Sequence, residues 1–193
     1  GVKRGHHVRE VAEATKRAKD AGLKVAYHMM PGLPGSSKSK DLESFRVMVE
    51  DERFKPDMLK IYPTLVVKGT ELHQQWIDGT YSPLSLEDTV DLLAGVKKMI
   101  PPWIRILRIQ RDIPVQLIES GVRKSHLREL VKEELQKRGD SCGCIRCREV
   151  GRDPSNRRPA KASDAALHEI EYKASGGIEK FISYDMSSPD SLV

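Results

Sequence analysis

The chain has 193 residues, of which 38% are hydrophobic, and a formal net charge of +5. No apolar run approaches the roughly 18 residues that a membrane-spanning helix needs, which excludes a transmembrane class for this sequence. The three cysteines are an odd number and no secretory leader is recognisable, so we expect a cytoplasmic protein without a membrane partner rather than a disulfide-built secreted domain.

The first part of the chain alternates between helix and strand patterns. Apolar residues recur with a helical period from Val8 until Gly22 supplies a stop signal. Residues 23–30 follow as a mostly buried strand, closed by the Gly/Pro loop 31–35. A second helix then leads to a strand over residues 58–62. The apolar face of that helix contains Leu42, Phe45, Met48 and Val49.

A third helix and a third strand repeat this order. Ser85 and Asp88 form a capping-box-like start, and a proline pair ends the helix that they open. The next strand is predicted over residues 103–110. A fourth helix begins near Ser125 and ends at the stop signal Gly139.

Strands that alternate with helices at this spacing are typical of parallel βα units, either in an open doubly wound sheet or in part of a barrel. Three units are too few to close an eight-fold barrel, so we expect an α/β chain that forms part of a larger unit. Near the C-terminus, residues 166–173 and 178–184 alternate around Ser175-Gly176-Gly177, which predicts a β-hairpin of a different domain. Residues 150–163, rich in Arg, Pro, Ser and Asn, are the expected linker.

All three cysteines lie within six residues after the fourth helix, at Cys142, Cys144 and Cys147. Thiols in a C-x-C-x-x-C array are too close together for ordinary bridging, whereas a structural zinc ion takes thiolates that converge from one tight turn. Zinc is the first interpretation, and unliganded buried thiols or redox chemistry are the alternative. His126 and His168 are the candidates for a fourth ligand.

Polar groups at the ends of the first two strands predict a binding site, because parallel βα proteins gather functional groups at the C-terminal ends of their strands. The loop from His28 to Gly35 holds two glycines and two prolines, which let a backbone approach a ligand closely and present its amides. A tight structural turn is the alternative. Lys60 and Tyr62 share one face of the second strand, and a lysine in an apolar strand favours a polar site over an exposed edge.

The basic excess lies in the middle of the chain. Residues 1–100 carry 16 basic and 14 acidic side chains, residues 101–160 carry 14 and 8, and residues 161–193 carry 3 and 6. This surplus suits a nucleic-acid partner, because neutralised phosphates release counterions; a solvated surface with salt bridges is the alternative. If Arg105 and Arg108 lie on opposite faces of their strand, they cannot form one patch. The candidate phosphate contacts are Arg105, Arg108, Arg111, Arg123 and Lys124.

Eight segments in a fixed order carry a family resemblance. They are Arg4-Gly5-His6, Ala21-Gly22-Leu23-Lys24-Val25, His28-Met29-Met30-Pro31-Gly32-Leu33-Pro34-Gly35, Leu59-Lys60-Ile61-Tyr62-Pro63-Thr64-Leu65-Val66, Gly69-Thr70, Gln110-Arg111-Asp112-Ile113-Pro114, Leu127-Arg128-Glu129-Leu130 and Arg148-Glu149-Val150-Gly151. Together they resemble the Elongator catalytic subunit family, the radical SAM tRNA wobble-uridine acetyltransferases. The resemblance extends over nearly the whole chain.

This resemblance implies an incomplete α/β architecture. Residues 1–138 would be the C-terminal half of a radical SAM partial (βα) barrel, residues 139–163 a zinc-binding cysteine turn and basic linker, and residues 164–193 the first β-hairpin of a GNAT-type acetyltransferase domain. The family's cysteine triad for a [4Fe-4S] cluster is expected upstream of Gly1, and its acetyl-CoA pyrophosphate loop beyond Val193. The chain alone is therefore expected to be inactive. The C-x-C-x-x-C turn occurs in only part of the family.

The resemblance also implies cofactors and partners. S-adenosyl-L-methionine and the cluster would supply a radical that activates the acetyl group of acetyl-CoA, which leaves a carboxymethyl group on the wobble uridine of tRNA. Further Elongator subunits or a homodimer are expected partners, and the basic residues above would contact tRNA. A non-catalytic, zinc-stapled RNA-binding or scaffold module is the alternative. The implied S-adenosyl-L-methionine contacts are His28, Met30, Pro31, Gly32, Lys60 and Tyr62.

Overall fold

The computed structural model describes residues 5–110, 113–149, 163 and 165–186. No helix in these ranges is both long and apolar enough to cross a membrane. The elements in chain order are α1 (Val8–Asp20), β1 (Ala26–Met29), α2 (Lys38–Glu50), β2 (Met58–Ile61), β3 (Val66–Val67), α3 (Glu71–Ile77), α4 (Leu86–Met99), β4 (Arg105–Ile109), the 3-10 turn η1 (Val115–Leu117), β5 (Ile118–Ser120), α5 (Leu127–Lys137), α6 (Ile145–Arg148), β6 (Ala165–Ala174) and β7 (Gly177–Met186).

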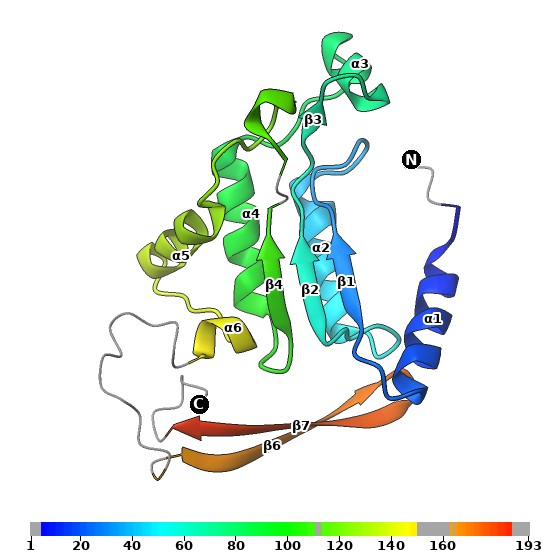
Figure 1. Ribbon diagram of the computed structural model, residues 1–193, viewed down its shortest axis with the longest axis vertical. Coiled ribbons are helices and arrows are strands. Elements are labelled where there is room, and N and C mark those ends of the chain that lie inside the picture. Colours follow the sequence, from blue (N-terminus) through cyan, green and yellow to red (C-terminus); the bar gives the residue numbers. More distant parts are fainter. Residues whose placement is uncertain (1–4, 111–112, 150–162, 164, 187–193) are drawn as a thin grey trace.

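A three-stranded parallel sheet in the order β1-β2-β4 is the centre of the fold. Helices α2 and α4 lie behind this sheet in Figure 1 and cover one of its faces. Leu59, Ile61 and Ile106 of the sheet are fully buried and share a core with Phe45 of α2 and Leu93 of α4. Removing this apolar area from water is the main stabilising contribution, at about 25 cal/mol per Å². The predicted α/β class is confirmed.

The local signals for helix ends act as predicted, although several boundaries differ. The Ser85 hydroxyl oxygen accepts a hydrogen bond from the Asp88 backbone N–H at 3.0 Å and caps α4. Gly139 adopts a left-handed conformation (φ 69°) two residues after α5 ends, as a stop signal requires. The fourth helix begins at Leu127 rather than near Ser125, and β1 is shorter than the predicted strand.

The free edge of the sheet at β1 borders an apolar cleft. Among the described strands, β1 pairs only with β2, and α1 lies beside its other edge (Figure 1). Thr15 is the one buried residue of α1, and Val8 of that helix is 65% exposed. The cleft between α1, β1 and α2 has a volume of about 590 Å³, and Val8, Val11, Met29 and Met48 are among its lining residues. The apolar side of α1 therefore faces this cleft rather than a closed core.

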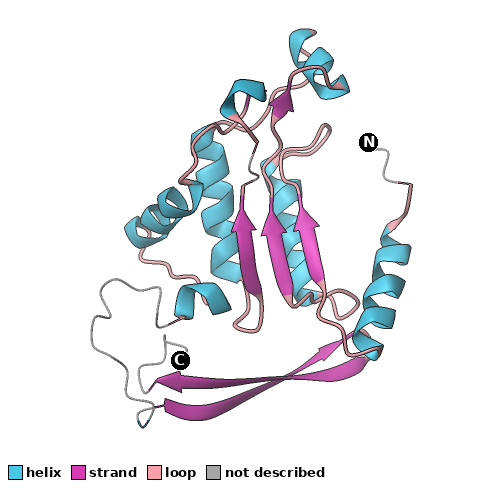
Figure 2. Cartoon of the chain, viewed as in Figure 1, coloured by secondary structure: helices cyan, strands magenta, loops and turns pink. Residues whose placement is uncertain are grey.

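The predicted C-terminal hairpin is present as the antiparallel pair β6 and β7. It lies across the N-terminal ends of the parallel strands (Figure 2). Alternate residues of the hairpin face this contact, where the Tyr172 ring stacks on Trp103 with centroids 4.1 Å apart and Ala174 is buried. The ion pairs of the contact are Lys19–Glu179 (3.2 Å) and Arg148–Asp185 (3.7 Å). The hairpin thus has an inner face that docks and an outer face that is exposed.

Replacing Tyr172 with alanine is expected to loosen the hairpin by about 1–3 kcal/mol, because the stack with Trp103 and its buried area are lost. Faster hydrogen exchange of the β6 and β7 amides would report this change. Tyr184→Ala is the matched control, since Tyr184 is 58% exposed and lies on the outer face. Equal effects of the two variants would contradict docking through the inner face.

Candidate functional site

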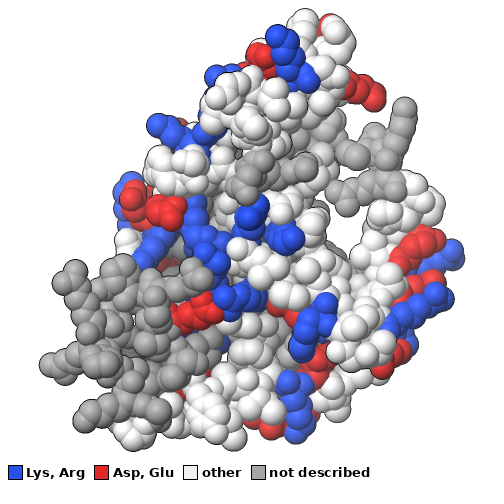
Figure 3. Space-filling model, in the orientation of Figure 1, with Lys and Arg blue, Asp and Glu red and all other residues white. Residues whose placement is uncertain are grey.

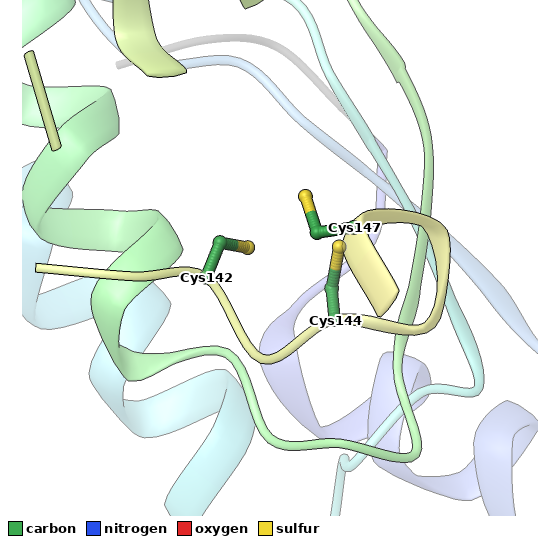
Figure 4. Close-up of side chains that lie close together, drawn as sticks. All are labelled: Cys142, Cys144 and Cys147. Carbon is green, nitrogen blue, oxygen red and sulfur yellow. The ribbon is translucent and has the colours of Figure 1, made fainter. Parts of the chain in front are cut away.

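The three cysteines converge in the turn between α5 and α6. Cys144 is the N-cap residue of α6, and Cys147 lies on that short helix. The three Sγ atoms all lie within 4.8 Å of one another, and Figure 4 shows the side chains arranged around a common space. In tetrahedral zinc sites, Zn–S bonds of about 2.3 Å place the sulfurs about 3.8 Å apart. The turn can therefore hold a metal ion after a small contraction.

Backbone contacts fix this cysteine turn to the start of β4. The Ile145 N–H donates to the Ile104 carbonyl oxygen at 3.1 Å. The Arg148 guanidinium donates from Nε to the Gly143 carbonyl (2.9 Å) and from Nη2 to the Pro102 carbonyl (3.1 Å). Cys144 is fully buried as a result. The positions of the thiols are thus set by the strand and not by the turn alone.

Two cations from neighbouring helices lie near the thiols. Lys97 of α4 is only 1% exposed, and Arg128 of α5 holds the Ile106 carbonyl through Nη2 while its Nη1 atom is buried without a hydrogen-bond partner in the described part of the chain. Burial and the nearby charge of Arg146 lower the pKa of Arg128. Hydrogen bonds with Cys142 and Cys144, and then the charges of Lys97 and Arg128, hold the pKa of Cys147 well below its usual range. This environment favours a thiolate at Cys147, whereas hydrogen bonding among the three thiols and burial raise the pKa of Cys142.

No fourth protein ligand joins the triad within the described ranges, where the only close group of metal-binding side chains is Cys142, Cys144 and Cys147. His126 is the N-cap residue of α5, at the end of that helix away from the cysteine turn. His168 is exposed on β6. Neither of the two predicted candidates is brought to the thiols.

The loop after β1 is fixed by side chains from three other segments. The Gly32 N–H donates to the Asp41 carboxylate at 2.7 Å, and the Tyr81 hydroxyl donates to the Gly32 carbonyl at 2.6 Å. The Thr64 hydroxyl donates to the carbonyl oxygen of the buried Pro31 at 2.8 Å. Both polar backbone groups of Gly32 are therefore occupied. These bonds fit the tight-turn alternative for the polar groups of Gly32, and the binding role of the loop stays a prediction.

Gly32 is also constrained by its neighbours. It adopts φ 80°, and a Cβ atom at this position would lie 3.2 Å from Cγ and Cδ1 of Leu84. A side chain there would be strained by its backbone and would push against Leu84. The loop at the C-terminal end of β1 is therefore rigid, as a binding surface needs to be.

The sheet brings three basic side chains into register on its uncovered face. His28 is paired with Lys60 and Lys60 with Arg108, and the His28 ring meets the Tyr62 ring edge-on at 5.6 Å. The pairing of β2 with β4 shifts by one residue between Leu59 and Lys60. Because of this irregularity, Arg105 and Arg108 both lie on the uncovered face, opposite Met58 and Lys60. Arg105 and Arg108 are therefore not separated by lying on opposite faces of β4.

The other predicted phosphate contacts are dispersed. Arg105 forms an ion pair with Glu149, so its charge is compensated within the chain. Arg123 and Lys124 are exposed in the loop before α5, where Arg123 donates to the Glu119 carbonyl oxygen. Arg111 lies outside the described residues. The set does not form a single patch.

Gln110 is a notable residue that the sequence analysis named only within a resemblance segment and did not list as a site candidate. It follows β4 with a left-handed backbone (φ 80°), and its Oε1 atom is buried without a hydrogen-bond partner in the part of the chain that is described. Left-handed residues other than glycine cost roughly 1–3 kcal/mol and concentrate at functional sites. Its only sequence signal was its place at a strand end. Met30, at the equivalent end of β1, is partly buried.

Comparison with known proteins adds an independent line of evidence. Residues 56–137 match the Radical_SAM C-terminal domain. Over 99% of its length the chain is 46% identical to the tRNA uridine(34) acetyltransferase of Methanocaldococcus jannaschii, of which it covers 36%. Human Elongator complex protein 3 is 42% identical over 98% of the chain, which covers 35% of that protein. A solved structure of an N-terminally truncated Methanocaldococcus infernus Elp3 matches with a TM-score of 0.92 and 44% identity, over 99% of this chain and 45% of that one.

In metal-free protein, iodoacetamide is expected to alkylate Cys147 first, because its thiol has a low pKa and is exposed whereas Cys144 is buried. The rate should be nearly flat between about pH 6 and about pH 8, whereas an ordinary thiol reacts about tenfold faster per pH unit in this range. Peptide mass spectrometry measures both.

Lys97→Met is expected to slow this alkylation, because it removes a charge that stabilises the Cys147 thiolate. Lys132→Met on the exposed side of α5 is the matched control and should leave the rate unchanged. Preferential alkylation of Cys142 would be inconsistent with the charge distribution described above.

Proposed function

We propose that the chain belongs to the family of the tRNA uridine(34) acetyltransferases and Elongator complex protein 3, and that it is part of an enzyme that transfers an acetyl-derived group to the wobble uridine of tRNA. The observation that carries the proposal is the identity to curated tRNA uridine(34) acetyltransferases along nearly the whole chain. Since the chain spans 36% and 40% of the length of two of them, we assign the activity to a longer protein that contains this segment.

S-adenosyl-L-methionine is the cofactor that we propose for the C-terminal edge of the sheet. When bound with a [4Fe-4S] cluster, it would supply a carbon radical; we assign the cluster's ligands to a part of the protein outside this sequence. Asp41, Tyr81 and Thr64 would hold the loop after β1 against the cofactor. The proposed contacts are His28, Met30, Pro31, Gly32, Lys60 and Tyr62.

The domain organisation that we propose follows the change in sheet type. Residues 1–138 would be the C-terminal half of a radical SAM partial barrel, and the unpaired edge of β1 with its apolar cleft supports this reading. Residues 139–163 would be the cysteine turn and linker. Residues 164–193 would begin a GNAT-type acetyltransferase domain, which the separate antiparallel hairpin supports.

Zinc is the metal that we propose for Cys142, Cys144 and Cys147. Three thiolates around a divalent ion leave a negative charge, and the buried Lys97 and the half-buried Arg128 would compensate it. The role would be structural, because the turn is bonded to the start of β4 while Arg148 also reaches Asp185 on the hairpin. The metal would hold the two parts in a fixed relation.

The proposed partners follow from the same family membership. tRNA would be the substrate and acetyl-CoA the acetyl donor. Further Elongator subunits or a second copy of the protein would complete the assembly, and the cytoplasm is the proposed location.

The proposal predicts a mass increase on uridine 34 when the longer protein, reduced anaerobically, is incubated with S-adenosyl-L-methionine, acetyl-CoA and unmodified tRNA. Mass spectrometry of the nucleosides measures it, and omission of either small molecule should abolish the product. If tRNA binds but uridine 34 never changes, the enzyme reading is wrong and the non-catalytic RNA-binding or scaffold module takes its place.

Gly32→Ala should lower this activity about tenfold or more, because the new Cβ meets Leu84 and displaces the loop at the end of β1. Gly79→Ala is the matched control, since Gly79 has a similar φ of 72° but open space around it. Equal losses in both variants would attribute the effect to backbone strain and not to the site.

The purified longer protein is expected to contain about one zinc ion per chain at the cysteine turn. Cys144→Ser should remove most of it, because oxygen replaces a buried soft ligand, while Ser141→Ala should retain it. Elemental analysis for zinc and iron together separates this site from the cluster, whose iron should not change. Zinc near background in the parent would refute the assignment.

A further inference from the structure

A buried network of ion pairs lies where α1, the start of β2 and the hairpin meet. The side chain of Lys19, near the C-terminal end of α1, is only 4% exposed. Its ammonium nitrogen lies 3.2 Å from the Glu179 carboxylate of β7 and 3.6 Å from the Asp57 carboxylate just before β2. Lys24 is the second cation on Asp57, at 3.3 Å. We call these two cations and two carboxylates the α1 network.

The other ion pairs of α1 in the described part of the chain lie in solvent. Arg9 pairs with Glu13 at 3.7 Å and Lys16 with Asp20 at 2.8 Å, and all four side chains are more than half exposed. Figure 3 shows acidic and basic side chains interspersed over this helix. Exposed pairs of this kind contribute little to stability. The partners of Lys19 therefore matter more for the position of α1 than its surface charges do.

One cross-strand pair of the hairpin contacts both the sheet and α1. Tyr172 and Glu179 are register partners on the inner face of the hairpin. The Tyr172 ring stacks on Trp103, whereas Glu179 pairs with Lys19. Burial, and then the charges of Asp57 and Glu179, raise the pKa of Tyr172, as expected for a phenol held beside both carboxylates. Docking on the sheet and contact with α1 are thus made by the same part of the hairpin.

The turn of the hairpin also contacts the far wall of the apolar cleft. The Ser175 N–H donates to the carbonyl oxygen of Glu52, in the loop after α2. Phe54, two residues further along, lines the cleft together with Val11 of α1. In Figure 1 the same turn lies beside the C-terminal end of α1. The docked hairpin therefore contacts the segments on both sides of the cleft.

We propose that the α1 network couples the docking of the hairpin to the position of α1, so that the width of the apolar cleft depends on whether the hairpin is docked. Glu179 forms no other ion pair with a described residue, so its charge is compensated only while α1 is in place. Undocking would in turn expose Lys19 to water and leave it with Asp57. Because displacement of either element removes a contact of the other, the coupling is reciprocal. It does not depend on the proposed function.

The test is hydrogen–deuterium exchange of the longer protein, read by mass spectrometry of its peptides. Glu179→Gln should make the α1 amides exchange about tenfold faster, although the substitution lies on β7, because a hydrogen bond between charged groups is lost. Lys19→Met should likewise speed the exchange of the β6 and β7 amides. The double variant should exchange no faster than Lys19→Met alone, because both substitutions remove the same contact.

Lys16→Met and Glu171→Gln are the matched controls. Lys16 pairs with Asp20 in solvent on the same helix, and Glu171 pairs with Lys180 on the outer face of the hairpin. Neither substitution should change the exchange of the other element. Lys19→Arg retains the charge and should protect both elements better than Lys19→Met does, which separates the loss of the ion pairs from a packing defect.

Faster exchange of α1 in Glu179→Gln, with β2 and β4 at the parent rate, supports the coupling. Exchange of α1 at the parent rate in that variant overturns it, whether or not β6 and β7 exchange faster, because the hairpin would then undock without any effect on the helix. Equal acceleration in β2 and β4 also overturns it, since the destabilisation would be global and not specific to α1.

Discussion

The one-sided burial of the parallel sheet is the constraint on which the rest of this structure depends. Leu59, Ile61 and Ile106 are removed from water by α2 and α4, and that packing fixes the strand order. Purely parallel sheets normally have both faces covered. Here the second face carries His28, Lys60 and other polar residues. Because successive side chains of a strand point to opposite faces, one face packs in the core and the other is available for binding.

The cysteine turn depends on the same packing in a less direct way. Its thiols are held where they are because Ile145 bonds to the backbone just before β4, and because Lys97 belongs to the helix that covers the sheet. A lysine that is 1% exposed costs stability unless negative charge compensates it. The Cys147 thiolate, whose pKa the charge of Lys97 helps to lower, can supply that charge, and a metal ion would let all three thiols be ionised together. A metal ion at the cysteine turn and the helical layer would thus stabilise each other.

Periodic patterns in the sequence predicted most of the helices and strands. The features that they did not predict depend on contacts between residues far apart in the sequence. The apolar period of α2 and the cap at Ser85 are local signals, which is why these helices were predicted correctly. By contrast, β3 has only two residues and pairs with β5 about fifty residues later, so it has no pattern of its own. The one-residue shift between β2 and β4 is a property of the pair. The face of the sheet on which Arg108 lies could therefore not be predicted from the sequence. The burial of Lys97 could not be predicted either, because in the sequence it resembles any basic residue near the end of a helix.

The two candidate sites lie at opposite ends of the sheet, and their physical demands differ accordingly. Contacts with the hairpin and the cysteine turn gather before β4 begins, at Trp103 and Ile104, where rigidity is what the fold needs. The glycine-containing loop, Tyr62 and Gln110 gather where the strands end, and Gln110 there combines a left-handed backbone with a buried Oε1 atom that has no hydrogen-bond partner among the described residues. In parallel βα proteins the first end serves stability and the second serves function. The C-terminal edge is therefore where we place the proposed chemistry, and at the opposite end Arg148 of α6 pairs with Asp185 of the hairpin.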